Sequence, residues 1–339
     1  MFELIDPAQA QNRSFGLVFH PSFSISSLPE YARQAEEMGF DELWLWDDCF
    51  LPGAFSAAAI ALSATHKIKV CIGLIPVPAL NPLFMAMEIT SLAGAFPGRF
   101  IAGFGHGVEP WMKQIGAAER SSLARLRETV TVVRDLLHGE EINFDGEFVR
   151  MEHVKMQQLP DAVPPLYIGA MREKSLALAG SLADGTLFTS MSSLTYTRWA
   201  LGHIQAGMQK AGKTDQRVVG FVDVKVNEAG ASARAATRRS LAARLPWADV
   251  HIQHSGYAEE IAQYLQTHSS ADLAKDMPDA WLDAFSASGT PQQVSTLLKQ
   301  WFEAGLNSII IQPLWGDASC QSEYIKYLPA ILKDLRNPL

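Results

Sequence analysis

The chain has 339 residues, of which 48% are hydrophobic and 19% charged, and this composition excludes intrinsic disorder and low-complexity fibres. Its 28 basic and 36 acidic residues give a net charge of −8. Because the basic residues are scattered, we expect no binding to nucleic acid or to an anionic membrane. The three cysteines lie far apart, with no Cys-x-x-Cys pair, which predicts a reducing, cytoplasmic location without disulfides or a thiolate zinc site.

Two segments bear on targeting and on the membrane. Residues 1–10 carry Glu3 and Asp6 and lack a basic stretch followed by an apolar core, so we expect no secretory signal. The uncharged run from Val70 to Met87 contains three prolines, which would break a membrane-spanning helix. We therefore expect no membrane partner.

Short apolar runs alternate with helical patterns along the chain. Ser27-Leu-Pro-Glu30 has the spacing of a helix capping box, and Gly39 suits the end of that helix. Strands are expected to start near residues 15, 42, 68, 100, 166, 186, 218 and 308. Eight such units predict an α/β fold, a (β/α)8 TIM barrel that forms a single domain over residues 1–339. A doubly wound sheet is the alternative, but no Gly-x-Gly-x-x-Gly or Walker-A sequence favours it.

Two insertions interrupt the alternation. Asp145-Gly146 lies between alternating residues in the segment 142–151, which predicts a β-hairpin with its turn at these two residues. Residues 232–288 have a helical and irregular pattern that is too long for a simple crossover. We expect this segment to form a lid over the site, as long barrel loops often do.

Barrel enzymes build their active sites at the carboxyl ends of the strands. These positions hold His20, Asp47, Asp48, His106 and Glu109. Each has a plain structural alternative, since the aspartates could cap the next loop, His106 could be a turn residue and Glu109 a solvated carboxylate. The pair His251-x-x-His254 lacks a third ligand, so we expect no metal site.

Two glycine-containing segments also leave strand ends. Gly103, Gly105 and Gly107 alternate at the end of one strand, and we interpret them as a surface where the backbone approaches a bulky ligand. The loop from Gly169 to Lys174 opens a helix and carries Arg172. Helix amides beside a guanidinium suit an anion such as a phosphate.

Several motifs in a fixed order resemble the bacterial luciferase-like monooxygenase superfamily, whose flavin- and deazaflavin-dependent members are oxidoreductases. The resemblance covers about residues 14 to 315. It rests on the segments 39–47, 68–78 with Asn81-Pro82, 97–107, 164–170, 179–185, 289–294 and 304–309.

The resemblance implies a barrel, often a homodimer, that binds FMN or coenzyme F-420 at the strand ends. It also implies a cis peptide bond between Gly73 and Leu74, in a bulge behind the cofactor ring. The matching contacts to the ring and tail of the cofactor are Asp47, Gly73, Leu74, Ile75, Pro76, His106 and Gly107. The matching phosphate contacts are Met171, Arg172, Lys174 and Ser175.

One departure from the pattern concerns the chemistry. Deazaflavin dehydrogenases of this type commonly have an Asp-His pair after the second strand, and this chain has Asp47-Asp48. A carboxylate cannot stabilise a developing anion as an imidazolium can, so His20 or His106 would have to take that role. The active-site glutamate of related sugar-phosphate enzymes corresponds to Glu109 after a shift of one residue.

The main hypothesis is an oxidoreductase that uses F-420 or FMN to transfer hydride to or from a small organic substrate, or to monooxygenate it. His20, Asp48, His106 and Glu109 are then the catalytic candidates, and Trp111 lines the substrate side. One alternative is a barrel hydrolase with Asp48 and Glu109 as its acid/base pair. Another is a flavin-binding relative without catalysis.

Overall fold

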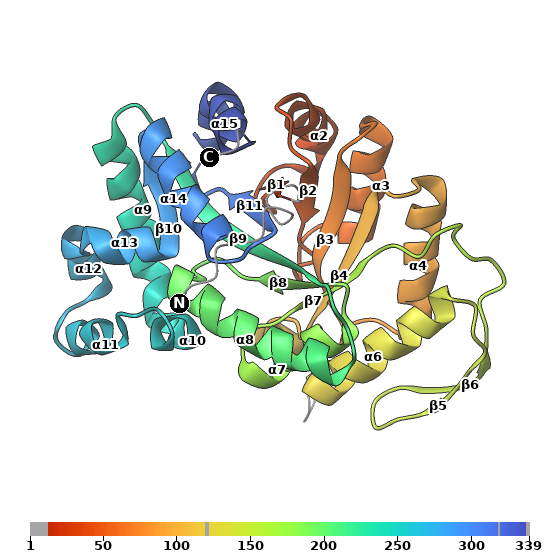
Figure 1. Cartoon of the computed structure of the whole chain (residues 1–339). Helices are drawn as coiled ribbons and strands as arrows, with labels where there is room; N and C mark the ends of the chain where they lie inside the picture. Colours follow the sequence, from red (N-terminus) through yellow and green to blue (C-terminus); the bar gives the residue numbers. More distant parts are fainter. Residues whose placement is uncertain (1–12, 119–121, 318, 337–339) are drawn as a thin grey trace.

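Eight parallel strands close into a barrel, and a ninth strand extends it at one edge. The computed structural model describes residues 13–118, 122–317 and 319–336. Figure 1 shows the strands surrounded by helices. The barrel strands are β1 (Ser14–Val18), β2 (Glu42–Leu45), β3 (Lys69–Pro76), β4 (Phe100–Gly105), β7 (Leu166–Gly169), β8 (Gly185–Phe188), β9 (Arg217–Val226) and β11 (Ser308–Gln312). Pairing of β8 with β9 closes the ring, which confirms the predicted TIM barrel and its eight strands.

The helices connect successive strands and shield the outer face of the barrel. Their bounds are α2 (Leu28–Glu37), α3 (Ala54–Ala64), α4 (Pro82–Ala95), α5 (Glu109–Gln114), α6 (Ser122–Leu137), α7 (Glu173–Leu182), α8 (Leu194–Lys210), α14 (Pro291–Glu303) and α15 (Cys320–Arg336). None of the helices in the described ranges is long and apolar enough to cross a membrane.

The first helix begins differently from the prediction. The side chain of Ser27 makes no capping bond to α2; its hydroxyl donates instead to the Ser24 carbonyl at 2.7 Å. Glu30 is engaged by Arg33 and Gln34. A short 3-10 turn, η1 (Ile25–Ser27), leads directly into the helix, so the capping-box prediction was wrong. The helix does end at Gly39, whose φ of +88° confirms the expected left-handed residue.

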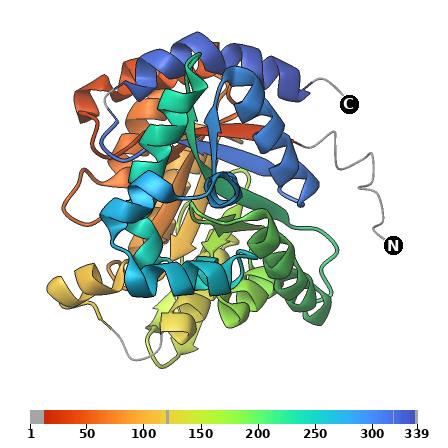
Figure 2. The same cartoon turned by 90° about the vertical axis from the view of Figure 1, so that its left-hand side faces the viewer.

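The segment 232–288 is an insertion of several short helices followed by a strand. The helices are α9 (Gly230–Arg244), η2 (Leu245–Trp247), α10 (Asp249–Gln253), α11 (Ala258–Thr267), α12 (Ser270–Asp276) and α13 (Asp279–Phe285). The strand β10 (Ser286–Gly289) corrects the prediction of a segment without strands. One edge of β9 pairs with β8 over Arg217–Gly220 and then with β10 over Asp223–Val226. Figure 2 looks onto this insertion.

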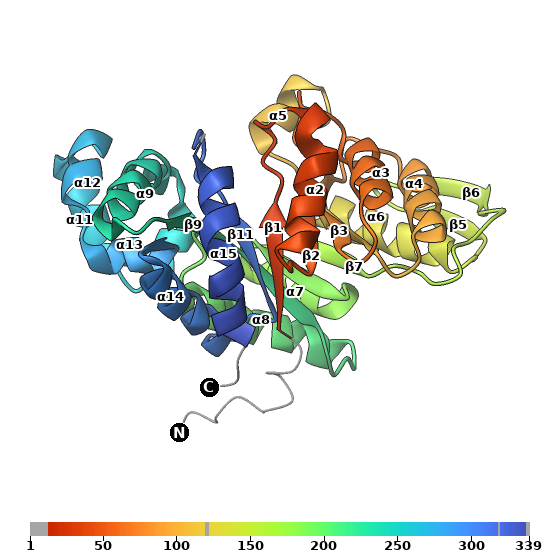
Figure 3. The same cartoon turned by 90° about the horizontal axis from the view of Figure 1, so that it is seen from above.

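The hairpin is present, but its turn is longer than predicted. Strands β5 (Ile142–Asp145) and β6 (Arg150–Val154) pair antiparallel, with Asp145 opposite Arg150. The turn therefore spans residues 146–149, and the Gly146 amide donates to the Val149 carbonyl. The Glu128 carboxylate accepts from the backbone amides of residues 147, 148 and 149, which explains why a turn of this length is stable here. Figure 3 shows the hairpin and the insertion at opposite ends of the molecule.

The barrel is filled with large side chains and closed at its amino-terminal end. Its interior cluster contains Val18, Trp44, Cys71, Ile101, Tyr167, Leu187, Val219, Phe221 and Ile310. Below it, the buried Glu42 carboxylate accepts from Ser14 Oγ at 2.8 Å, Trp44 Nε1 at 2.9 Å and Ser308 Oγ at 3.0 Å. These contacts plug the barrel axis at that end, and the strand-end rule assigns the functional site to the other end.

Candidate functional site

We call the carboxyl ends of the barrel strands and the loops that follow them the barrel mouth. Side chains alternate along a strand, so the residue two positions beyond each interior residue again faces the barrel axis. This places His20 above Val18, Trp46 above Trp44 and Asp223 above Phe221. The ring contacts agree, since the His20 and Trp46 centroids are 5.4 Å apart and those of Trp46 and Phe221 are 6.3 Å apart.

His20 is a neutral, buried hydrogen-bond donor. Its exposed fraction is 2%, and burial lowers its pKa to about 4. The Ser22 amide donates to Nδ1 at 3.2 Å, so the proton of the neutral ring lies on Nε2. Nε2 is buried and has no hydrogen-bond partner within the described residues. The ring packs between Trp46 and Trp315, at 5.4 and 4.6 Å between centroids, and a buried donor of this kind calls for an acceptor.

His106 has the opposite tautomer. Its Nδ1 lies 3.1 Å from the Ser122 carbonyl, which can only accept, so Nδ1 carries the proton. Burial lowers the pKa of this histidine as well, and the neutral ring therefore presents the lone pair of Nε2. His20 and His106 thus offer a donor and an acceptor, and neither is an imidazolium at neutral pH.

The two consecutive aspartates have different surroundings. Asp47 accepts from the Ala54 amide at 3.0 Å, at the first turn of α3, as the capping alternative predicted for it. The Asp48 carboxylate has no hydrogen bond to the described residues, and its pKa is raised by burial and by the charge of Asp47. Burial and both carboxylates also raise the pKa of the Cys49 thiol, which makes this cysteine a poor nucleophile. Asp48 is therefore the carboxylate of the pair that is free to exchange a proton.

Glu109 lies at the start of α5 and forms an ion pair with Lys113 at 2.6 Å. Its side chain is 77% exposed, and Lys113 lowers its pKa. This geometry matches the solvated-carboxylate alternative and leaves Glu109 a weak general acid. Trp111, on the same helix, packs against Phe50 with ring centroids 6.3 Å apart.

The alternating glycines surround a side chain of the protein itself. The peptide bond between Gly73 and Leu74 is cis, and the register with β4 shifts between Ile72 and Ile75. A Cβ atom at Gly105 would lie 2.4 Å from Leu74 Cδ1, and one at Gly169 would lie 2.3 Å from the same atom. At Gly103 it would lie 3.3 Å from Leu74 Cδ2. Gly105 and Gly169 therefore make room for Leu74, whereas a Cβ atom at Gly103 would first meet the Ile72 carbonyl at 2.6 Å and Leu187 Cδ1 at 2.8 Å. Our interpretation of Gly103 and Gly105 as a direct ligand surface was wrong.

Gly107 has a different reason to be glycine. Its φ is +71°, and a Cβ atom there would lie 2.8 Å from Met112 Sδ. The residue therefore turns the chain from β4 towards α5 in a conformation that other residues rarely adopt.

The loop after β7 is held by hydrogen bonds from several elements. The Ser175 hydroxyl accepts from the Arg172 amide at 3.2 Å and donates to the Arg172 carbonyl at 2.9 Å. Tyr196 donates its hydroxyl to the Met171 carbonyl at 2.9 Å. Arg172 itself reaches Asp249 on α10 at 2.9 Å. A rigid loop at the start of a ten-residue helix, with a guanidinium beside it, retains the features expected of an anion site.

Two residues near the barrel mouth, Asp223 on β9 and Arg244 of the insertion, were not singled out by the sequence patterns. Asp223 on β9 is fully buried; it accepts from Gln312 Nε2 at 3.0 Å and pairs with Arg244 of α9. Burial raises the pKa of Asp223, and Arg244 opposes that rise. The one available signal was a lone carboxylate in the apolar strand of residues 218–226. Arg244 gave no signal, because the expectation of a lid over residues 232–288 does not tell which of its side chains reaches the barrel mouth.

The histidines of the insertion pack against the barrel. His251 Nε2 lies 3.0 Å from Thr189 Oγ1, and its ring is 4.8 Å from Tyr196. His254 stacks on Trp199 at 3.7 Å. Within the described ranges, no group of three or more His, Cys, Asp and Glu side chains is arranged to hold a metal ion. The His-x-x-His pair therefore anchors α10 over the loops that follow β7 and β8.

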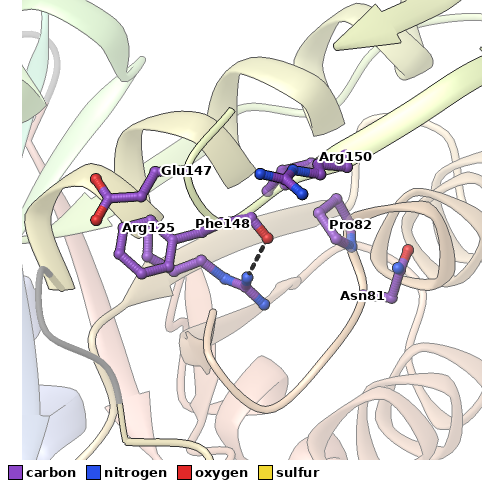
Figure 4. Close-up of a pocket in the computed structure, with 7 residues that line it drawn as sticks. Asn81, Pro82, Arg125, Glu147, Phe148 and Arg150 are labelled. Carbon is purple, nitrogen blue, oxygen red and sulfur yellow. Dashed lines mark hydrogen bonds between the residues drawn. The ribbon is translucent and has the colours of Figure 1, made fainter. Parts of the chain in front are cut away.

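One cavity lies outside the barrel mouth, where the hairpin turn meets the start of α4. It has a volume of about 420 Å³ and is lined by Asn81, Pro82, Arg125 and residues 147–150. Figure 4 shows the Arg125 guanidinium directed at the Phe148 carbonyl, to which it donates at 2.8 Å. Arg125 also reaches the Val77 carbonyl at 3.4 Å. These contacts join the hairpin to the loop after β3, which is a structural role.

The fold and the residues gathered at its mouth define a (β/α)8 barrel of the enzyme type. The sequence profile of the luciferase-like monooxygenases matches residues 6–308. The chain therefore belongs to the luciferase-like monooxygenase family, as the motifs indicated.

Two curated relatives are similar in sequence. A 5,10-methylenetetrahydromethanopterin reductase from Archaeoglobus fulgidus is 28% identical over 307 residues, which cover 87% of this chain and 92% of the relative. An F420-dependent glucose-6-phosphate dehydrogenase from Kribbella flavida is 31% identical over 222 residues, which cover 60% of this chain and 66% of the relative.

Solved structures share the fold. The coenzyme F420-dependent tetrahydromethanopterin reductase from Methanopyrus kandleri has a TM-score of 0.80 and 22% identity, covering 93% of this chain and 98% of that one. The oxygenating constituent of 3,6-diketocamphane monooxygenase from Pseudomonas putida, in complex with FMN, has a TM-score of 0.75 and 18% identity, covering 96% and 98%. At these identities the likeness concerns the fold alone. The named relatives are oxidoreductases, so the hydrolase alternative has no support.

Proposed function

We propose that the protein is an oxidoreductase that uses coenzyme F-420 or FMN on a small organic substrate bound at the barrel mouth. The bound cofactor would supply the hydride carrier or, in the case of FMN, activate oxygen. The observation that carries the proposal is the buried Nε2–H of His20, a donor without an acceptor, enclosed by the rings of Trp46 and Trp315. Family membership and the named activities of the relatives support it.

The residues at the mouth suit an aromatic cofactor with a phosphate. Leu74 and the bulge of β3 form an apolar floor, and the loop after β7 offers an amide-rich helix start and Arg172 for the phosphate. The residues that would hold the ring are Asp47, Gly73, Leu74, Ile75, Pro76, His106 and Gly107. Those that would hold the phosphate are Met171, Arg172, Lys174 and Ser175.

The protonation states divide the chemical work among three residues. His20 donates a hydrogen bond to an oxygen of the substrate or cofactor, because its Nε2 carries the proton. His106 accepts a proton through its free Nε2 lone pair. Asp48, whose pKa is raised, exchanges a proton with the substrate in the position that a histidine commonly holds in the resembling dehydrogenases. Glu109, bound to Lys113, lies too far into solvent to share that work.

The charge pattern around the mouth points to a substrate without a phosphate. Arg244 pairs with Asp223, Arg172 with Asp249, and Lys113 with Glu109. Lys225 pairs with Asp317 and Glu323. With Arg172 and Lys174 assigned to the cofactor phosphate, the other cations matched and Asp48 unpaired, a further phosphate on the substrate would meet repulsion. An uncharged molecule with a flat apolar face would instead pack on Trp46 and Trp315.

The test is a fluorescence titration of the purified protein with F-420 and with FMN, followed by turnover of a substrate panel. We expect binding of at least one cofactor, oxidation or reduction of uncharged carbonyl or alcohol substrates, and little activity on glucose 6-phosphate. The variant His20→Phe should lose most turnover, and its cofactor affinity tells whether the acceptor of the Nε2–H is a substrate oxygen (affinity kept) or a cofactor oxygen (affinity reduced). A protein that binds neither cofactor contradicts the proposal, and binding with no turnover of any substrate would favour the non-catalytic alternative.

The chain works as one barrel unit that pairs with a second copy in the cytoplasm. The outer faces of α3 and α4 carry a single charged residue, Glu88, and expose Ile60, Phe84 and Met87. Such an uncharged apolar face is typical of a subunit interface. The free thiols of all three cysteines suit a reducing compartment. Size-exclusion chromatography with light scattering should find a dimer, and Met87→Glu should yield monomers.

A further inference from the structure

A basic groove lies on the outside of the barrel, between α6, α7 and α8. Its volume is about 360 Å³. Leu123, Ala177, Leu178 and Gly207 form an apolar part of its lining, and the cations Arg127, Lys174 and Lys210 also line it. We call this surface the basic groove.

The positive charge of the basic groove is not neutralised by acidic residues of its own lining. None of its nine lining residues is acidic, and the three cations have no ion pair with an acidic residue in the described part of the chain. Glu128, next to Arg127, directs its carboxylate at the backbone amides of residues 147–149. Arg172, Arg244 and Lys113 at the barrel mouth, in contrast, each have a carboxylate partner. The basic groove therefore differs from the mouth in its capacity to bind an anion.

The basic groove continues from the loop that follows β7. Lys174 is the second residue of α7, directly after the turn in which Ser175 binds the backbone of Arg172. The same lysine lines the basic groove. An anion held at the start of α7 is therefore beside one end of the basic groove, and a chain attached to that anion can run along it.

We propose that the basic groove binds a carboxylate-bearing extension of the cofactor beyond its phosphate. This rests on the proposed function, and it distinguishes the two cofactors. FMN ends at its phosphate, whereas coenzyme F-420 carries glutamyl residues beyond it. The methylene groups of a glutamyl chain fit the apolar lining, and its carboxylates fit Arg127, Lys174 and Lys210. The structure thereby favours F-420 over FMN.

The experiment titrates the full-length protein with three ligands, namely F-420, its analogue that lacks the glutamyl residues, and FMN. We expect F-420 to bind more tightly than the truncated analogue. The difference in affinity between these two ligands should become smaller as the salt concentration is raised. The charge reversals Arg127→Glu and Lys210→Glu should each weaken F-420 binding about two- to fivefold or more, as expected for exposed ion pairs. They should leave the truncated analogue unaffected, and Lys333→Glu on α15 serves as a matched control.

Two outcomes overturn the inference while leaving the proposed function in place. One is equal affinity for F-420 and for the truncated analogue. The other is a reversal at Arg127 or Lys210 that weakens both ligands alike or neither. If the wild-type protein binds none of the three ligands, the proposed function itself fails. Circular dichroism of each variant verifies that the fold is intact before affinities are compared.

Discussion

Replacing Gly105 by alanine should force a methyl group against the side chain of Leu74. The new Cβ would lie 2.4 Å from Leu74 Cδ1, 3.2 Å from its Cβ and 3.3 Å from its Cγ. Non-bonded carbon atoms are ordinarily at least about 3.5 Å apart, so the Leu74 methyl group would have to move by about 1 Å. The Leu74 side chain cannot move freely, because the backbone at Gly169 and at Gly103 lies close to its other sides.

The expected cost is that of overpacking, about 1–3 kcal/mol in the free energy of unfolding. The measurement is urea denaturation of Gly105→Ala, Leu74→Ala and the double variant. Leu74→Ala alone removes packing and costs stability. In its background the alanine at 105 should cost much less, since only the 3.2 Å contact with the Cβ of residue 74 remains, which gives a coupling energy of about 1 kcal/mol or more. Gly94→Ala on α4 is the control, since a Cβ there meets nothing within 4 Å.

Cofactor binding supplies a second measurement, because Leu74 forms the floor of the mouth. Gly105→Ala should weaken binding in proportion to the displacement of Leu74, and the double variant should recover part of it. The reasoning is refuted if Gly105→Ala is as harmless as Gly94→Ala. It is equally refuted if its cost is unchanged when Leu74 is already alanine.

Three further predictions concern charge and protonation. Burial lowers the pKa of His20 and His251 to about 4, so the unfolded chain binds more protons than the folded one between about pH 6.5 and 4. The free energy of unfolding should therefore fall as the pH is lowered through this window, by up to about 1.4 kcal/mol per pH unit for each histidine. The variant His20→Gln should show a flatter dependence of the urea midpoint on pH. Asp223→Asn leaves Arg244 without its buried partner and should lower the free energy of unfolding by about 3–5 kcal/mol, as measured by urea denaturation. The double variant Asp223→Leu/Arg244→Met should recover part of this stability. Asp249→Asn should release Arg172 and tighten FMN or F-420 binding about two- to fivefold; unchanged affinity would show that Asp249 does not compete for the guanidinium.

The barrel was predictable because its signals are local. Each strand is a short apolar run and each helix a periodic one, and the strand-end rule follows once eight units are counted. Strand β10 was not predicted, because the residues of Ser286-Ala-Ser-Gly289 are small and mostly polar and give no apolar run. The segment forms a strand by pairing with β9. The turn 146–149 depends in the same way on a side chain of another element, Glu128 on the preceding helix α6.

The mouth was only partly predictable, for the same physical reason. His20, Asp48 and His106 follow their strands directly, so their positions could be inferred from spacing. Asp223 needed the knowledge that it lies two residues above Phe221 inside the barrel, and Arg244 needed the path of the insertion. The role of Gly105 is set by Leu74 on a neighbouring strand, a contact that no sequence pattern of β4 reveals.

The shared edge of β9 ties the dynamics of the barrel to those of the insertion. On this edge the segment 217–220 pairs with β8, whereas the segment 223–226 pairs with β10. If the insertion detaches for a moment, the upper half of β9 loses its partner while the lower half keeps its own. Hydrogen exchange along this one strand should therefore fall into two classes, and the faster class would report opening of the insertion beside Asp223.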